Sequence, residues 1–295
     1  MRCSSMVIIW GSRPYFRSNV VVQHGFCEHC DQFAKLKSFD ARRFFHLYYI
    51  PMIPTQGKRR NHKMCPKCKV SQVIEPEAFE TIIRTFKQHS ADALVAVLSG
   101  DETFRMSAVE PDPGAVESVD ESGGGVPEPE DDDEPSDAVS YLHVVQDWIY
   151  AAGDAQFCEG IVQKLADPAV RYAREVLAGN LAIMRGNVDA AVEHYAAAAD
   201  AKPDEAFPVL RRTHLLELKG RPEEVVEGYG RVIELVEDPR ERLGPLIRMA
   251  DQQMTLKRFG DAVTSYERVF EIEPSLASEK PIAKAYKKAK KKAGV

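Results

Sequence analysis

Six cysteines occur in the 295-residue sequence, and four of them form two C-x-x-C pairs, Cys27 with Cys30 and Cys65 with Cys68. Two residues between thiols let one turn present both sulfurs to a single ion. Two such turns complete the tetrahedral site of a structural zinc, with Zn–S bonds of about 2.3 Å. We therefore expect these four cysteines to hold one structural Zn²⁺, with no coordination position left for a substrate.

Other chemistries use the same motif. A redox dithiol is usually an exposed pair at a strand–helix junction within a βαβ pattern, and neither pair has that surrounding sequence. Iron also suits a thiolate tetrahedron, and a redox-sensitive zinc site stays open as well. His29 and His62 lie near the thiols in the sequence. Because four thiolates satisfy zinc, we expect both histidines to lie outside the coordination sphere.

The elements that position the thiols are predicted to be short strands. The 34 residues between the two pairs fit a β-hairpin with turns. Residues 43–54 (RFFHLYYIPMIP) are aromatic and β-prone, which predicts one central strand, and residues 7–10 and 20–22 predict two shorter strands. Because so small a sheet has little core, we expect it to depend on zinc, which supplies roughly 10–16 kcal/mol in such modules.

Residues 6–74 resemble a group of small zinc-ribbon proteins. The shared features are the opening IIWGSR at 8–13, the two C-x-x-C pairs, and the FHLYYIPMIP segment followed by Gly57 and Lys58. The resemblance implies zinc coordination by the same four cysteines, and it implies no activity. The second pair departs from the group because Lys69 stands where a glycine is usual.

Charge divides the chain into parts. Residues 1–90 carry 15 Lys and Arg against 6 Asp and Glu (+9), residues 91–140 carry 1 against 15 (−14), and residues 141–295 carry 23 against 24 (−1). The acidic middle cannot bury enough apolar surface to offset its ordering entropy. We predict a zinc ribbon at 1–75, a short helical extension at 76–100, a disordered acidic linker at 101–137 and a helical repeat domain at 138–295.

The repeat domain has a period near 34 residues. Gly186, Gly220 and Lys257 precede equivalent turns, and small, aromatic and small residues follow each at fixed offsets: Ala191, Tyr195 and Ala198; Val225, Tyr229 and Val232; Ala262, Tyr266 and Val269. This pattern resembles the tetratricopeptide repeat (TPR). An ordinary helical bundle is the alternative, although it has no reason to keep this register. The expected fold class is thus a small β zinc ribbon followed by an all-α solenoid of TPR-like hairpins, with a degenerate hairpin at 138–167 and a basic capping helix at 280–292.

The TPR resemblance implies a concave groove, lined by the first helix of each hairpin, that takes a protein or peptide partner. In the register of the family, the predicted groove residues are Asn180, Met184, Arg211, His214, Leu218, Arg248, Asp251 and Met254. The leading hypothesis is therefore a scaffold or adaptor that is not an enzyme, since the sequence has no phosphate-binding loop and no recognisable catalytic motif.

The less favoured alternative is a nucleic-acid-associated regulator that uses the basic ribbon. Its contact residues would be Lys58, Arg59, Arg60 and Lys63, close to aromatic residues. No apolar run reaches the roughly 20 residues that span a bilayer, and no signal peptide is apparent. We therefore expect a cytoplasmic protein with no membrane partner.

Overall fold

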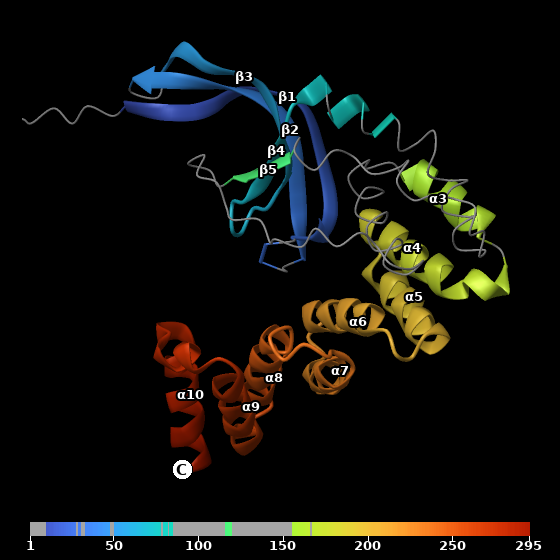
Figure 1. Ribbon diagram of the computed structural model, residues 1–295, viewed down its shortest axis with the longest axis vertical. Helices are drawn as coiled ribbons and strands as arrows, with labels where there is room; N and C mark the ends of the chain where they lie inside the picture. The colour runs from blue at the N-terminus through green and yellow to red at the C-terminus, as the bar shows by residue number, and fades with distance from the viewer. Residues whose placement is uncertain are drawn as a thin grey trace, which may run out of the picture. The chain divides into compact units, whose positions relative to one another are not determined.

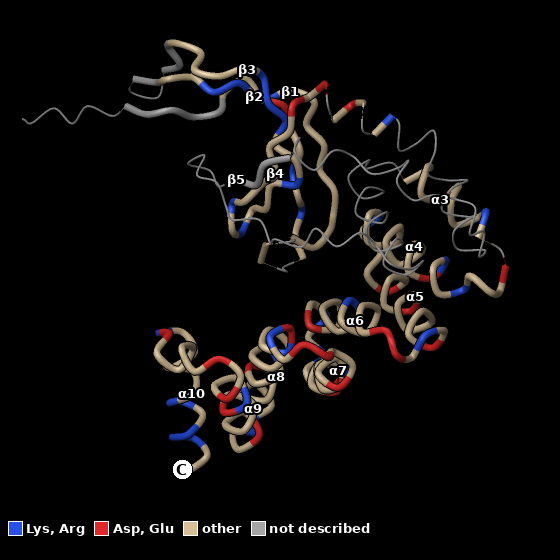
Figure 2. The backbone as a smooth tube through the Cα atoms, viewed as in Figure 1, with Lys and Arg blue, Asp and Glu red and all other residues tan. Residues whose placement is uncertain are grey.

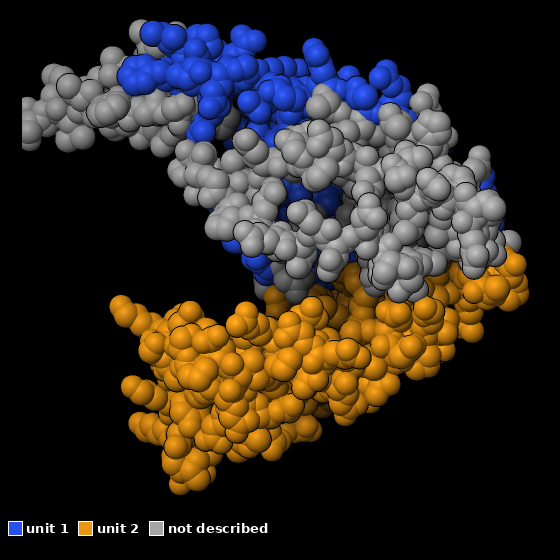
Figure 3. Space-filling view, in the orientation of Figure 1, with its two compact units in different colours: residues 1–165, 183–186 blue, residues 166–182, 187–295 orange. Residues whose placement is uncertain are grey.

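The computed structural model describes residues 10–27, 29–30, 33–47, 50–77, 79–81, 83–84, 116–119, 155–165 and 167–295. The chain forms two compact units, coloured separately in Figure 3. The first comprises residues 1–165 and 183–186, and the second comprises residues 166–182 and 187–295.

The first unit is built on one antiparallel sheet with the strand order β1-β2-β3-β4-β5 (Figure 1). Its strands are β1 (Trp10–Phe26), β2 (Phe33–Leu47), β3 (Ile50–Met64), β4 (Ser71–Ile74) and β5 (Val116–Val119). β2 and β3 form the hairpin expected between the two cysteine pairs. The strands are longer than expected. The strand predicted at 20–22, for example, is only the interior of β1, which has 17 residues. The other short prediction, at 7–10, meets the described residues only at Trp10, where β1 begins.

The aromatic segment 43–54 is not one central strand, and this prediction is wrong. It comprises the end of β2 and the beginning of β3, with Leu47 paired to Ile50 and His46 paired to Pro51. The hairpin folds the segment onto itself, so its two apolar halves lie on neighbouring strands. Proline cannot donate to a ladder, and the register of β2 against β3 shifts next to Pro51 and Pro54.

A short part of the predicted acidic linker belongs to the sheet. Residues 116–119 form β5, which pairs antiparallel with β4 from Ser71↔Val119 to Ile74↔Val116. The expectation of disorder therefore does not hold for these four residues. The rest of the linker lies outside the described residues. After β4, the described residues from Pro76 to Arg84 are helical, which agrees with a helix at the start of the predicted extension.

Little apolar surface supports this sheet. Its buried apolar side chains, among the described residues, are Cys27, Ala34, Leu36, Phe39, Ala41, Cys65 and Ile74, with Phe79 of the following helix. Two of these eight are cysteines of the predicted metal site. The first unit also contains α3 (Ala155–Lys164), whose Cys158 is buried. The remainder of the degenerate hairpin at 138–154 lies outside the described residues.

The second unit is a row of antiparallel helical hairpins. Its helices are α4 (Arg171–Met184), α5 (Val188–Ala201), α6 (Ala206–Leu218), α7 (Pro222–Leu235), α8 (Leu243–Thr255), α9 (Phe259–Ile272) and α10 (Lys280–Ala293). Two short 3-10 turns, Pro168–Val170 and Pro274–Ser278, precede α4 and α10. The pairs α4/α5, α6/α7 and α8/α9 are the three hairpins predicted from the repeat.

The turn inside each hairpin repeats closely. Gly186, Gly220 and Lys257 all have positive φ, at 74°, 66° and 61°. At each of them, two backbone amides bond back to carbonyls of the preceding helix, for example Arg258 to Gln253 at 2.8 Å. This is the left-handed cap that glycine adopts easily. Lys257 therefore holds a glycine conformation, which explains why a lysine could be aligned with two glycines.

The small–aromatic–small pattern forms the core of the hairpins. Tyr195, Tyr229 and Tyr266 are each at most 1% exposed, and the residues four before and three after each tyrosine are equally buried. Close packing explains the small residues around them. A Cβ placed on Gly179 would lie 3.1 Å from the Tyr195 ring.

Within the described residues, no helix is both long and apolar enough to cross a lipid bilayer.

Candidate functional site

The sheet topology brings the two cysteine pairs to the same end of the first unit. β1 and β3 flank β2 and both run antiparallel to it, so β1 and β3 end together beside the start of β2. Cys27 directly follows β1 and Cys65 directly follows β3. Ala34 and Leu36 at the start of β2 pack against both cysteines. Two cysteine pairs separated by 34 intervening residues are thereby brought into contact.

The four sulfurs have the spacing of a tetrahedral metal site. All four Sγ atoms lie within 4.8 Å of one another. The Sγ atoms of Cys27 and Cys68 are 3.6 Å apart, and those of Cys30 and Cys65 are 3.8 Å apart. A tetrahedron with Zn–S bonds of about 2.3 Å has edges of about 3.8 Å. Both contacts are far longer than the roughly 2.05 Å of a disulfide, so the cluster could hold one metal ion without rearrangement.

The backbone of the second pair forms a turn around Cys65. Its carbonyl accepts the amide of Lys69 at 3.0 Å, and the amide of Lys67 donates to the Cys65 Sγ at 3.4 Å. Lys69 has φ of 67°, the left-handed conformation that glycine adopts most easily. The turn therefore places a lysine in a backbone conformation that favours glycine.

The electrostatics of the cluster also favour a bound cation. Burial raises the pKa of the Cys27 thiol. Burial also opposes ionisation of Cys65, but the amides of Cys68 and Lys67 and the neighbouring thiols lower its pKa below the ordinary value. Four clustered sulfurs cannot all ionise without an opposing charge, and a divalent ion supplies that charge.

The two nearby histidines lie in different surroundings. His29 is exposed. His62 is 2% exposed, and its Nδ1 lies 3.3 Å from the Ser38 hydroxyl while its ring packs on Phe79. Burial, together with the charges of Lys63 and Arg60, holds the pKa of His62 well below its usual value. The metal cluster in the described part of the chain contains neither histidine.

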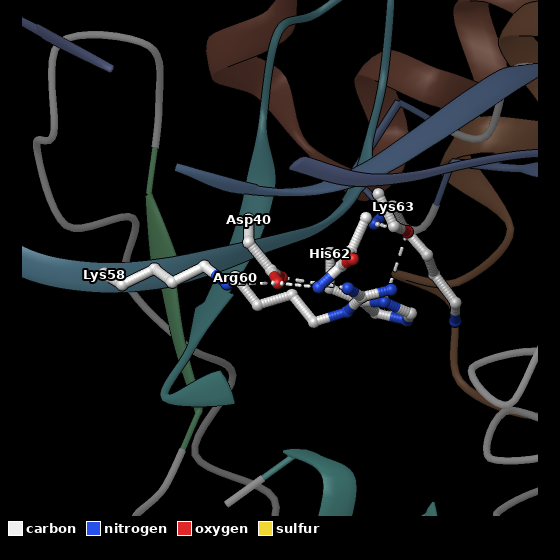
Figure 4. A network of polar contacts seen from close by, with 7 residues as sticks. Asp40, Lys58, Arg60, His62 and Lys63 are labelled. Atoms are coloured by element: carbon white, nitrogen blue, oxygen red, sulfur yellow. Dashed lines mark hydrogen bonds and ion pairs between the residues drawn. The ribbon is translucent and has the colours of Figure 1, made fainter. Parts of the chain in front are cut away.

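Three of the four predicted nucleic-acid residues, Lys58, Arg60 and Lys63, belong to a polar network that contains the buried Asp40 and His62 (Figure 4). Asp40 is 2% exposed, and its carboxylate accepts from Arg60 at 3.0 Å, Lys58 at 3.2 Å and Asn19 at 2.7 Å. Although burial opposes ionisation, these three partners lower the pKa of Asp40. Arg60 also stacks on the ring of Phe79, 4.6 Å from its centroid.

Arg59 pairs with Glu75 at 3.1 Å. The backbone amide of Lys63 donates to the Ser38 hydroxyl at 3.0 Å. Three of the four predicted nucleic-acid residues therefore have acidic partners, in β2 or directly after β4. This pairing reduces the charge that they could offer to phosphate.

The predicted groove residues of the first hairpin are mostly buried. Asn180 is 2% exposed, and its side-chain oxygen accepts the Tyr195 hydroxyl at 2.5 Å. Met184 is half-buried. Along α4, Ala173 and Val176 are also buried, so this helix offers little of its surface to a ligand.

The second hairpin is more open. Leu218 at the end of α6 is 48% exposed. Arg211 is half-buried with its guanidinium 5.1 Å from the Phe207 ring centroid. His214, in contrast, is 3% exposed against Tyr229. Burial, with Arg248 and Arg211 nearby, lowers the pKa of His214 to about 3.

In the third hairpin, Asp251 is exposed and accepts the Tyr266 hydroxyl at 2.7 Å, while Met254 is half-buried.

A residue that the sequence did not single out, Glu217, connects the second and third hairpins. It accepts from Tyr229 at 3.0 Å, Arg248 at 3.2 Å and Gln252 at 3.1 Å. Glu217 lies three residues after His214, and its only sequence signal is this position on the face of α6 that carries the groove residues.

Comparison with known proteins is informative mainly for the repeats. The sequence matches no protein-family profile and no curated protein. The TPR2B domain of yeast Sti1, in a complex with pHsp70, is 20% identical over 41% of this chain and 97% of its own, with a TM-score of 0.34. BtubC from P. vanneervenii is 14% identical over 74% of this chain and 85% of its own, with a TM-score of 0.47. A thermophilic TPR protein of Thermus thermophilus is 12% identical over 72% of this chain and 97% of its own, with a TM-score of 0.37. Because all three scores are below 0.5, the interpretation of the repeats rests on their own turns and packing.

Proposed function

We propose that this protein is an adaptor. One structural Zn²⁺, bound by Cys27, Cys30, Cys65 and Cys68, stabilises the N-terminal sheet, and the helical repeats bind a protein or peptide partner. The observation that carries the metal assignment is the spacing of the four sulfurs, which fits a zinc–thiolate tetrahedron. The four thiolates fill the coordination sphere, so the role of the ion is structural and not catalytic.

The partner surface lies on the open parts of α6 and α8. Leu218 stands out among the large apolar side chains of the described repeats because almost half of its surface is exposed. Arg211 provides a cation on α6 and Asp251 provides an exposed carboxylate on α8, where Arg248 is paired with Glu217. A peptide that docks there would bury an apolar side chain against Leu218 and pair charges around it. His214 supports α6 from inside the second hairpin, where it packs against Tyr229.

The partner-binding half is tested by the substitution Leu218→Lys in the full chain. The matched control is Glu227→Gln at an exposed position of α7, which raises the net charge by one as Leu218→Lys does. Proteins that co-purify with the wild type and the control should be lost from the Leu218→Lys variant. Equal recovery with all three chains would refute a partner surface on α6.

The proposed four-cysteine metal site is tested by replacing the bound ion with Co²⁺. Four thiolates around Co²⁺ give visible absorption characteristic of tetrahedral coordination, whereas zinc is colourless. The wild type should show this absorption, and Cys68→Ser should change it. A spectrum typical of octahedral oxygen coordination would contradict the proposed ligand set.

A further inference from the structure

The last helix, α10, combines a packed apolar face with a free basic face. Ala289 is fully buried against α9, and Tyr286 packs edge-on against Phe270 with ring centroids 5.1 Å apart. Gly294 ends the helix in the left-handed conformation. Apolar contacts with α9 therefore hold α10 in place, and the face of α10 opposite these contacts remains exposed.

That opposite face is a stripe of lysines. α10 contains seven lysines and no acidic residue, a formal charge of +7. The lysines of α10 lie near the C-terminus in Figure 2. Six of them are exposed and form what we call the lysine stripe: Lys280, Lys284, Lys287, Lys288, Lys291 and Lys292. With about 100° per residue, these positions fall within an arc of about 140° on one side of the helix.

Several arginines of the repeats are paired with a neighbouring acidic side chain. Arg174 pairs with Glu175 at 3.0 Å and Arg231 with Glu234 at 3.2 Å, and Arg221 pairs with Glu224. Among the described residues, no side-chain ion pair or hydrogen bond joins a lysine of the stripe to the rest of the protein. Lys290 is the exception on α10, because its ammonium lies over the Tyr286 ring at 5.6 Å.

Helix stability explains only part of this pattern. Cations in the last turn interact favourably with the helix dipole, which accounts for Lys291 and Lys292. Lys280 lies in the first turn, where a positive charge opposes the dipole, and Lys284 and Lys287 lie in the middle. These three lysines do not stabilise the helix through the dipole, so an external anion is the simpler explanation for them.

We propose that the lysine stripe binds the phosphodiester backbone of a nucleic acid without reading its sequence. From Lys280 to Lys292 the stripe spans 12 helical steps, about 18 Å at 1.5 Å per residue, so it offers one charge per roughly 3 Å. A strand of B-DNA carries one phosphate per 3.4 Å of axis, which is nearly the same linear density. The site lies on the repeats and uses none of the cations of the sheet that pair with Asp40 and Glu75. It does not depend on the proposed adaptor function.

Two other anionic partners fit less well. A helix that inserts into a membrane surface buries its apolar face in lipid, but the apolar face of α10 is already packed on α9. Protein interfaces are enriched in arginine and aromatic residues and depleted in lysine, whereas the stripe contains lysine alone. A nucleic-acid backbone needs only a row of positive charges.

The test is fluorescence anisotropy of the full chain with a labelled duplex DNA and a labelled single-stranded RNA, each in two unrelated sequences. If all six lysines make contact, the logarithm of the binding constant should fall against the logarithm of salt concentration with a slope up to about −5 for the duplex and −4 for the single strand. The two sequences of each kind should bind alike. A preference for duplex or single strand identifies the form of nucleic acid that the stripe accepts.

The decisive variant is Lys284→Gln, Lys288→Gln and Lys291→Gln together, which should reduce the steepness of the slope by about 2 to 3. The control is Arg174→Gln, Arg221→Gln and Arg231→Gln, which changes the net charge from −6 to −9 as the variant does but leaves the stripe intact. The control should bind like the wild type. No binding at about 50 mM salt, or equal loss in both variants, would overturn the proposal. Binding to vesicles rich in phosphatidylserine but not to nucleic acid would assign the stripe to a membrane and overturn it as well.

Discussion

The buried His214 makes the stability of the helical repeats depend on pH. Burial and two nearby arginines lower its folded pKa to about 3, whereas an unfolded histidine titrates near 6.5. Between these two values the unfolded chain binds a proton that the folded chain does not. The contribution of the neutral His214 to the free energy of unfolding is therefore fully present above about pH 6.5, and it is lost progressively as the pH falls below that value.

The magnitude follows from the two pKa values. At pH 5.5, one unit below the unfolded pKa, protonation of the unfolded chain lowers the free energy of unfolding by about 1.4 kcal/mol relative to neutral pH. The assay is urea unfolding of the full chain at about pH 7.5 and 5.5, followed by the helical circular dichroism signal, which comes mainly from the repeats.

The control is His214→Gln, which is neutral at both pH values. The variant will have lost some packing, so the informative quantity is the difference between its stability at the two pH values. That difference should be smaller than in the wild type by about 1.4 kcal/mol, because the other histidines titrate alike in both chains. Identical pH dependence in the two chains would show that His214 is accessible to protons when folded, and would refute the reasoning.

Three further predictions concern a close packing contact, a buried ion pair and a left-handed backbone position. Gly228→Ala should destabilise the second hairpin by about 1–3 kcal/mol, because the new Cβ would collide with the Thr213 hydroxyl; in a Thr213→Ala background the same change should cost much less, and an equal cost would contradict the collision. Asp40→Asn should destabilise the sheet by about 3 kcal/mol, since Arg60 is left without its carboxylate; hydrogen exchange of the β2 and β3 amides measures this, and unchanged protection would refute it. Lys257→Gly should stabilise the third hairpin by about 1 kcal/mol, because glycine adopts its φ of 61° without strain; thermal unfolding at a lower temperature would argue against that cap.

The repeats could be predicted from sequence because each of their signals is local. A glycine or lysine at a left-handed turn, followed by small and aromatic residues at fixed offsets, determines one hairpin without reference to the next. Tyr195, Tyr229 and Tyr266 occupy the equivalent buried positions that this register requires. The basic capping helix could be predicted for the same reason, since α10 shows its apolar and charged faces within 14 residues.

The sheet is less predictable because its pairing is not local. The four cysteines can be identified by spacing, and the structure brings them together. The strand boundaries depend on where the chain reverses, and an apolar run such as 43–54 contains no polar residue pair to mark the turn. β5 could not be foreseen, because Val116–Val119 pairs with a strand more than 40 residues earlier and lies within an acidic segment.

The predicted groove residues show a second limit of sequence reasoning. The register of a repeat identifies positions on a helix face, but it does not say which of them the tertiary structure covers. Asn180 and His214 were predicted to line a groove and are buried, while Leu218 is exposed. Glu217 was missed because its importance depends on partners contributed by α7 and α8, which no single helix pattern reveals.

The four-cysteine zinc site is tested most directly by measuring the metal content of the full chain, purified under reducing conditions, in the wild type and in Cys65→Ser. We expect one zinc per chain in the wild type, and in the variant a loss of zinc together with loss of the folded sheet. A wild-type chain with less than stoichiometric metal and an intact sheet, or a variant that keeps both its zinc and its fold, would contradict the central claim.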